Sequence, residues 1–116
     1  MVDDLPQARA FLSRVLEQYG GFRVLTATTV ADSLRVLDTT AVDAVVADLW
    51  LSGPGAADGG NLLDAVGKWH RGVVRILTTA DPLGATIAET GGHLYYDKDD
   101  SSFVLISMIR RAVPRA

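Results

Sequence analysis

Short apolar segments with the composition of buried strands alternate with amphipathic helical segments along the whole chain. The strand-like segments are Phe22–Ala27, Ala44–Leu49, Val73–Thr78 and Leu94–Tyr96, and Met1–Val2 precedes the first helix. The run Ala44–Leu49 is apolar and β-branched, which predicts a strand buried on both faces. Strands that alternate with helices pair in parallel through right-handed crossovers. The sequence therefore predicts an α/β fold: an open, doubly wound, parallel five-stranded sheet flanked by helices, with a first strand that is truncated or unusually short.

Amphipathic periodicity predicts the helices between and after these strands. Several of them begin or end at a residue that favours a helix terminus. These residues are Pro6, Gly20, Thr29, Pro82, Gly91, and Ser101 or Ser102. No repeat or linker divides the 116 residues, so we expect a single domain over residues 1–116.

Composition excludes several classes of protein. The chain has no cysteine, which rules out thiol catalysis and cysteine-based zinc sites. A formal net charge of −3 argues against a general surface for polyanions, and we expect no direct nucleic-acid binding. The acidic start at Asp3 and Asp4 is not that of a signal peptide, and no apolar run approaches the ~18 residues of a membrane span. We therefore expect a cytoplasmic protein that does not bind a membrane.

Polar residues follow the predicted strands at the points where the strands end. Asp3 and Asp4 follow the first, Asp48 lies at the end of the third, Thr78–Thr79 at the end of the fourth, and Lys98 after the fifth. In open parallel sheets the working site lies beyond these carboxyl ends. Carboxylates about 4 Å apart repel by roughly 4 kcal/mol, and an all-oxygen site with few ligands suits Mg²⁺. A lysine and a threonine hydroxyl beside it would bind a phosphoryl group.

Simpler interpretations of some of these residues stay open. Acids are favoured at a helix start, so Asp3 and Asp4 suit one without any metal. Lys98 lies among three neighbouring aspartates and would also suit a surface ion pair. Trp50 would equally cover apolar surface. The two histidines, His70 and His93, are too few and too far apart for a metal cluster.

Four short motifs resemble the receiver domain of bacterial response regulators, in the order and at the strand ends expected of that family. They are VDD at residues 2–4, VVADL at 45–49, ILTTA at 76–80 and YYDK at 95–98. The resemblance covers essentially the whole chain and implies a flavodoxin-like fold and a role in two-component signal transduction and phosphorelay. It implies a phosphoprotein that accepts a phosphoryl group from a histidine kinase or a phosphotransfer protein. It also suggests a second copy of the chain as a partner, in a homodimer formed through the last helix.

The resemblance also implies the role of each site residue. Asp48 would be the phosphoacceptor, and Mg²⁺ would be bound by Asp48 and Asp4 directly and by Asp3 through water. Lys98 would pair with the phosphoryl oxygens. The chain would be no enzyme with a separate substrate, because it would assist only its own phosphorylation and dephosphorylation.

The switch residues follow from the same resemblance. Thr79 would carry the switch hydroxyl, and Thr78 is the alternative if the alignment with the family is shifted by one residue. Tyr95 would be the aromatic residue that changes rotamer. Trp50 and Asp81, each two positions after a site residue, would border the path of the hydrolytic water.

The sequence departs from the family pattern at several positions. Only Met1 and Val2 precede the acidic pair, the segment from Thr79 to Lys98 is short, and Ser52 and Asp99 stand where the family commonly has proline. Without that second proline, the family's cis peptide bond is not expected. An alternative function is a phosphorylation-independent pseudo-receiver that acts as a protein-interaction module. A small flavodoxin-like cofactor binder is disfavoured, because the first turn, residues 3–6, is acidic and lacks glycine.

Overall fold

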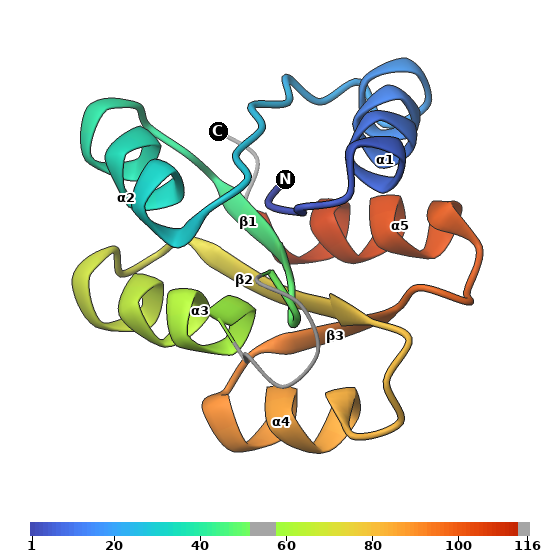
Figure 1. The fold of residues 1–116 in the computed structure, drawn as a ribbon. Helices are drawn as coiled ribbons and strands as arrows, with labels where there is room; N and C mark the ends of the chain where they lie inside the picture. Colours follow the sequence, from blue (N-terminus) through green and yellow to red (C-terminus); the bar gives the residue numbers. More distant parts are fainter. Residues whose placement is uncertain (52–57, 114–116) are drawn as a thin grey trace.

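The computed structural model describes residues 1–51 and 58–113, which form helices around a parallel sheet (Figure 1). The elements are α1 (Pro6–Gln18), α2 (Val30–Thr39), β1 (Ala44–Asp48), α3 (Asp58–Trp69), β2 (Val74–Thr79), α4 (Gly84–Gly91), β3 (Leu94–Asp97) and α5 (Ser102–Ala112). The expectation for Ser52 lies outside the described residues. The peptide bonds described are all trans, as expected from Asp99.

The sheet has three parallel strands in the order β1-β2-β3 within the described ranges. Asp48 is paired with Thr78, and Thr79 is paired with Asp97, so the three strands end at one edge. On the other side of β1, Val2 forms isolated parallel bridges to Ala47 and to Ala27. The expected α/β architecture is present, but the first two of the five expected strands are each reduced to one bridging residue, Val2 and Ala27.

The segment Phe22–Ala27, expected as a strand, joins the sheet only at Ala27. A strand forms only where a neighbour supplies hydrogen-bond partners along its length. Here the neighbour is Val2 with its two flanking residues, so the remainder of the segment has no ladder to pair with. The sequence pattern of a strand is present, but its partner is too short.

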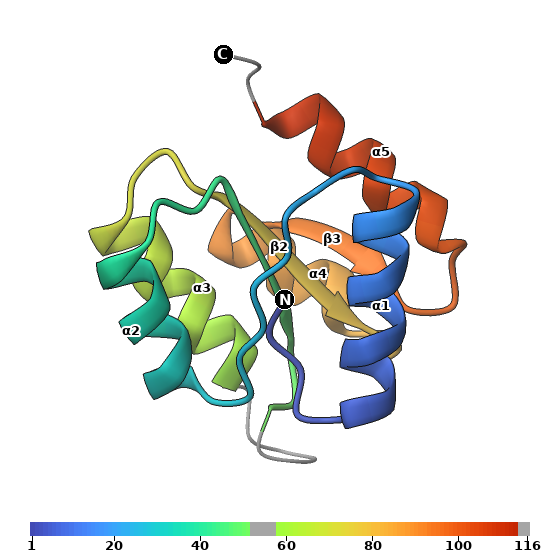
Figure 2. The same ribbon diagram turned by 90° about the horizontal axis from the view of Figure 1, so that it is seen from above.

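Helices cover both faces of the sheet, with α1 and α5 on one face and α2, α3 and α4 on the other (Figure 2). The α1/α5 face buries one apolar cluster, which includes Leu16, Val46 and Ile76. The opposite face buries a second cluster, which includes Leu63 and Leu77. In the described part of the chain, no helix has the length and apolar character needed to cross a bilayer.

Two helix starts and one helix end follow the signals read from the sequence, whereas α4 begins at Gly84, two residues after the Pro82 that was expected to open it. The Thr29 hydroxyl accepts a hydrogen bond from the amide of Asp32 at 3.1 Å, and Ser101 caps α5 by accepting one from Phe103. Gly92 ends α4 with a φ of 72°, a conformation that favours glycine. These contacts lie within one helical turn, which is why the sequence alone was sufficient to predict them.

Candidate functional site

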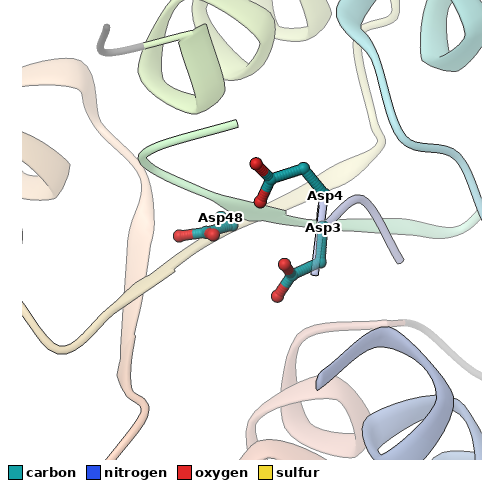
Figure 3. A group of neighbouring side chains, drawn as sticks. All are labelled: Asp3, Asp4 and Asp48. Carbon is teal, nitrogen blue, oxygen red and sulfur yellow. The ribbon is translucent and has the colours of Figure 1, made fainter. Parts of the chain in front are cut away.

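Three carboxylates meet at the carboxyl edge of the sheet (Figure 3). Asp48 is the last residue of β1, and Asp3 and Asp4 follow the bridge residue Val2. One oxygen from each carboxylate lies within 4.8 Å of the others. Asp3 and Asp48 are buried, and Asp4 is the most accessible of the three. The convergence expected from the strand ends is therefore present.

The ammonium group of Lys98 binds two of these carboxylates. Its Nζ lies 3.2 Å from Oδ2 of Asp3 and 3.3 Å from Oδ2 of Asp48. Lys98 directly follows β3, and its amide donates to the carbonyl oxygen of Thr79 at 3.2 Å, which holds the start of its side chain at the sheet edge. The lysine thus points into the acidic cluster, and no ion pair with its neighbouring aspartates is found among the described residues.

Backbone amides hold two of the carboxylates in place. The amide of Leu5 donates to Oδ1 of Asp3 at 2.9 Å, and the amide of Trp50 donates to Oδ1 of Asp48 at 3.4 Å. Arg9 on α1 donates to the carbonyl oxygen of Asp3 at 2.9 Å. Asp3 therefore has partners for both carboxylate oxygens, whereas the accessible Asp4 is the member that is best placed to receive a cation from solvent.

Burial raises the pKa of Asp48, and the charge of Asp3 raises it further, although Lys98 opposes both effects. Three carboxylates share one ammonium group, so the cluster carries an excess of negative charge in a largely buried place. Hard cations with oxygen ligands relieve such an excess. The donor set therefore fits Mg²⁺.

Thr79 and Tyr95 lie together beside this cluster. The Tyr95 hydroxyl donates to the carbonyl oxygen of Thr79 at 3.2 Å. The methyl group of Thr79 and the ring of Tyr95 both contact the space next to Gly84, at the start of α4. Strand alternation directs Thr78 to the opposite face, and its buried hydroxyl has no hydrogen-bond partner among the described residues. The geometry thus pairs Tyr95 with Thr79 rather than with Thr78.

Solved structures of receiver domains superpose on nearly the whole chain. The receiver domain of NtrX from Brucella abortus is 24% identical with a TM-score of 0.81, and covers 96% of this chain and 93% of its own. The receiver domain of an HD domain-containing protein from Pseudomonas fluorescens Pf-5 is 25% identical with a TM-score of 0.81, over 96% and 89% of the two chains. The chain has the receiver-domain fold. The beryllofluoride-activated NtrC4 receiver domain, a dimer, is 25% identical with a TM-score of 0.80, over 97% and 92%. No protein-family sequence model and no curated protein sequence matches the chain.

The two residues expected along the water path of a receiver domain have different surroundings. Trp50 is partly buried against the apolar cluster under α2 and α3, and its backbone amide donates to Oδ1 of Asp48 at 3.4 Å. The amide of Asp81 donates to the Thr79 hydroxyl at 3.1 Å, and its carboxylate accepts from the amide of Leu83 at 2.8 Å. Asp81 is therefore held in the turn that leads to α4.

Two glycines next to the candidate site were not identified from the sequence. A Cβ at Gly59 in the first turn of α3 would overlap the carbonyl group of Asp48, and one at Gly84 would overlap Thr79. Both positions require a residue without a side chain, because the start of a helix approaches the end of a strand closely there. The glycines are visible in the sequence, but nothing local indicates which strand they would contact.

Proposed function

We propose that this chain is a phosphoacceptor receiver domain, in which Asp48 accepts a phosphoryl group from a phosphohistidine in a Mg²⁺-dependent reaction. The observation that carries the proposal is the ammonium group of Lys98, which lies between Asp3 and Asp48 at 3.2 and 3.3 Å. A lysine that bonds to two buried carboxylates provides the positive charge that a phosphoryl group on Asp48 would require.

The phosphoryl transfer forms one bond and breaks one bond. A carboxylate oxygen of Asp48 attacks the phosphorus of the donor's phosphohistidine, the new O–P bond forms, and the N–P bond breaks. The donor imidazole leaves with a proton. In this step Lys98 moves from the carboxylate oxygens to a phosphoryl oxygen, and Asp3 keeps the amide bond from Leu5 that holds it in place.

Asp3, Asp4 and Asp48 are the residues that would hold Mg²⁺. When bound, the ion supplies positive charge to the phosphoryl oxygens and offsets the repulsion among the three carboxylates. The accessible position of Asp4 suits direct ligation, and the ion pair of Asp3 with Lys98 suits the water-mediated role that the resemblance implies.

We propose Thr79 and Tyr95 as the switch. A phosphoryl group on Asp48 would draw the Thr79 hydroxyl away from the amide of Asp81, to which it is now bonded at 3.1 Å. The Tyr95 ring, which packs with Thr79 beside Gly84, would then have to move, and the start of α4 with it. Trp50 and Asp81 stay our candidates for the borders of the water path.

The proposed partners are a cytoplasmic histidine kinase or phosphotransfer protein and a second copy bound through α5. The exposed Phe103 and Val104 on α5 offer apolar surface for such a contact. The chain would not turn over a separate substrate. A phosphorylation-independent module would need neither the carboxylate cluster nor the lysine that binds it, so those residues favour the phosphoacceptor over that alternative.

Intact mass spectrometry after incubation with acetyl phosphate and Mg²⁺ tests the proposal. We expect one added phosphoryl group on the parent and on Asp43→Asn, an exposed aspartate at the other end of the β1 region. We expect none on Asp48→Asn and none on the parent without Mg²⁺. An unmodified parent with Mg²⁺ would instead support the pseudo-receiver.

A further inference from the structure

Arg9 makes a hydrogen bond that joins α1 to the chain beside the acidic cluster. Its Nη1 donates to the carbonyl oxygen of Asp3 at 2.9 Å, six residues back along the sequence. Arg9 closes the first turn of α1, which begins at Pro6 and has neither a side-chain cap nor an acidic residue in that turn. A cation in the first turn opposes the helix dipole. The helix itself therefore gives no reason for an arginine at this position, and the contact with Asp3 supplies one.

The carbonyl group that Arg9 binds belongs to the peptide unit between Asp3 and Asp4. A peptide unit is planar, so a side chain that fixes the carbonyl oxygen also fixes the direction in which the chain continues to the Cα of Asp4. The other contacts of Asp3 are made by its amide, which donates to Ala27 at 3.3 Å, and by its Oδ1, which accepts from Leu5 at 2.9 Å. Arg9 is the side chain that binds the peptide unit itself.

Of the three carboxylates in the cluster, Asp4 depends most on this peptide unit. Asp3 and Asp48 are buried, and Lys98 binds them at 3.2 and 3.3 Å. The carboxylate of Asp4 is the most accessible of the three, and it has no hydrogen bond or ion pair within the described ranges. Figure 3 shows that the side chains of Asp3 and Asp4 leave the chain in different directions. The position of the Asp4 carboxylate is therefore set by its backbone and its own rotamer.

We propose that Arg9 is a positioning residue for the metal site. Its bond to the peptide unit before Asp4 holds the Asp4 carboxylate at the cluster and thereby raises the affinity of the cluster for Mg²⁺. Mg²⁺ demands near-ideal octahedral geometry, so a ligand whose backbone moves is a weaker ligand. This role rests on the metal-binding part of the proposed function, and it gives Arg9 no contact with the ion or with the phosphoryl group.

The charge of Arg9 and its hydrogen bond predict opposite effects on Mg²⁺ binding. A positive charge beside the site repels a divalent cation, so removal of the charge alone would strengthen binding. Loss of the bond to the Asp3 carbonyl group frees the peptide unit before Asp4, which would weaken binding. The sign of the change in affinity therefore separates positioning from simple electrostatics.

The test is a titration of the metal-free protein with MgCl₂, followed by NMR through the amide resonances of residues 3–5 and 48–50. Arg9→Met removes the donors and keeps an apolar stem, whereas Arg9→Lys keeps a charged donor without the planar fork. The control, Arg14→Met, removes an exposed arginine of the same helix. We expect Arg9→Met to raise the Kd for Mg²⁺ about tenfold, as found for the outer-shell partners of metal ligands. Arg9→Lys should fall between this variant and the parent, and Arg14→Met should bind like the parent.

The same spectra test whether the effect passes through Asp4. In metal-free Arg9→Met, the ¹⁵N shift of Asp4 should move because its peptide unit has lost a hydrogen bond, and the shift of Asp48 should stay. Thermal unfolding shows whether each variant is folded at the temperature of the titration. If Arg9→Met does not fold, Arg9→Lys decides by itself, because it keeps the charge: a raised Kd supports positioning by the guanidinium group, and a Kd at or below that of the parent contradicts it.

Three further results would overturn the role of Arg9. They are an equal or lower Kd in Arg9→Met, a raised Kd without a shift change at Asp4, and an equal loss of affinity in Arg14→Met. In each of these the parent still binds Mg²⁺, so the proposed function survives. A parent that does not bind Mg²⁺ would overturn the metal dependence of the proposed function and the role of Arg9 together.

Discussion

Replacing Asp48 by Asn should stabilise the metal-free fold, because the acidic cluster carries unbalanced charge. Asp48 lies within 4.8 Å of both Asp3 and Asp4 and 3.3 Å from Lys98. At an effective dielectric near 20, each repulsion amounts to about 3.5 kcal/mol and the attraction to about 5 kcal/mol. The two repulsions exceed the attraction by about 2 kcal/mol, and burial of the carboxylate adds to this cost.

We therefore expect Asp48→Asn to raise the free energy of unfolding by about 2 kcal/mol at neutral pH, low salt and no Mg²⁺. For a chain of this length that is a rise in melting temperature of roughly 6–12 °C. Differential scanning calorimetry with and without Mg²⁺ measures it, and Asp43→Asn, exposed and outside the cluster, should melt like the parent. Added Mg²⁺ should narrow the difference in melting temperature between the variant and the parent, because the variant lacks one metal ligand and gains less stability from the ion.

The pH dependence of this effect has a definite sign. The pKa of Asp48 is raised in the folded state, chiefly by burial, above its ordinary value of 3.8. The folded protein therefore binds more protons, and the parent loses stability as the pH rises from 3.8 through the folded pKa. The advantage of the Asn variant should vanish below pH 3.8. The reasoning is refuted if the variant is less stable than the parent at neutral pH without Mg²⁺, or if Mg²⁺ stabilises both equally.

Three further predictions concern the switch, the lifetime of the phosphoryl group and the amino terminus. Thr79→Ala should accept phosphate but lose the amide chemical-shift changes that phosphorylation produces, and Thr78→Ala should keep them; identical shift changes in both variants would contradict the Thr79–Tyr95 pairing. Trp50→Asn should shorten the phosphoryl lifetime several-fold, because each tenfold in rate needs only about 1.4 kcal/mol, and an unchanged lifetime in a dephosphorylation time course would remove Trp50 from the water path. Burial lowers the pKa of the Met1 amino group from 8.0 to about 6, so stability should rise with pH between these values, by at most about 2.7 kcal/mol. N-terminal acetylation, which leaves both histidines unchanged, should abolish that rise in a melting series from pH 6 to 8.

Sequence reasoning succeeded where the determining contacts are local or follow from strand direction. The caps at Thr29 and Ser101 act within one turn, so the residues themselves indicate where a helix begins. The meeting of Asp3, Asp4 and Asp48 was predictable because parallel strands end at the same edge of a sheet.

Sequence reasoning failed where a residue depends on a partner distant in the chain. The segment Phe22–Ala27 has the composition of a strand, yet only Ala27 pairs, because ladder formation depends on how much chain lies beside it. The contacts of Gly59 and Gly84 likewise depend on how closely a helix start approaches a strand end.

The ion-pair partners of Lys98 show most clearly what the sequence determines and what only the tertiary structure decides. The sequence by itself determined an α/β alternation, the strand ends and the set of residues that carry charge there. It places Lys98 among three aspartates and leaves a surface ion pair open. Only the tertiary structure decided that its ammonium group binds Asp3, which is 95 residues away along the chain, and Asp48. Charges interact through distance in space, and that distance is set by the packing of β1, β2 and β3 side by side rather than by the order of residues.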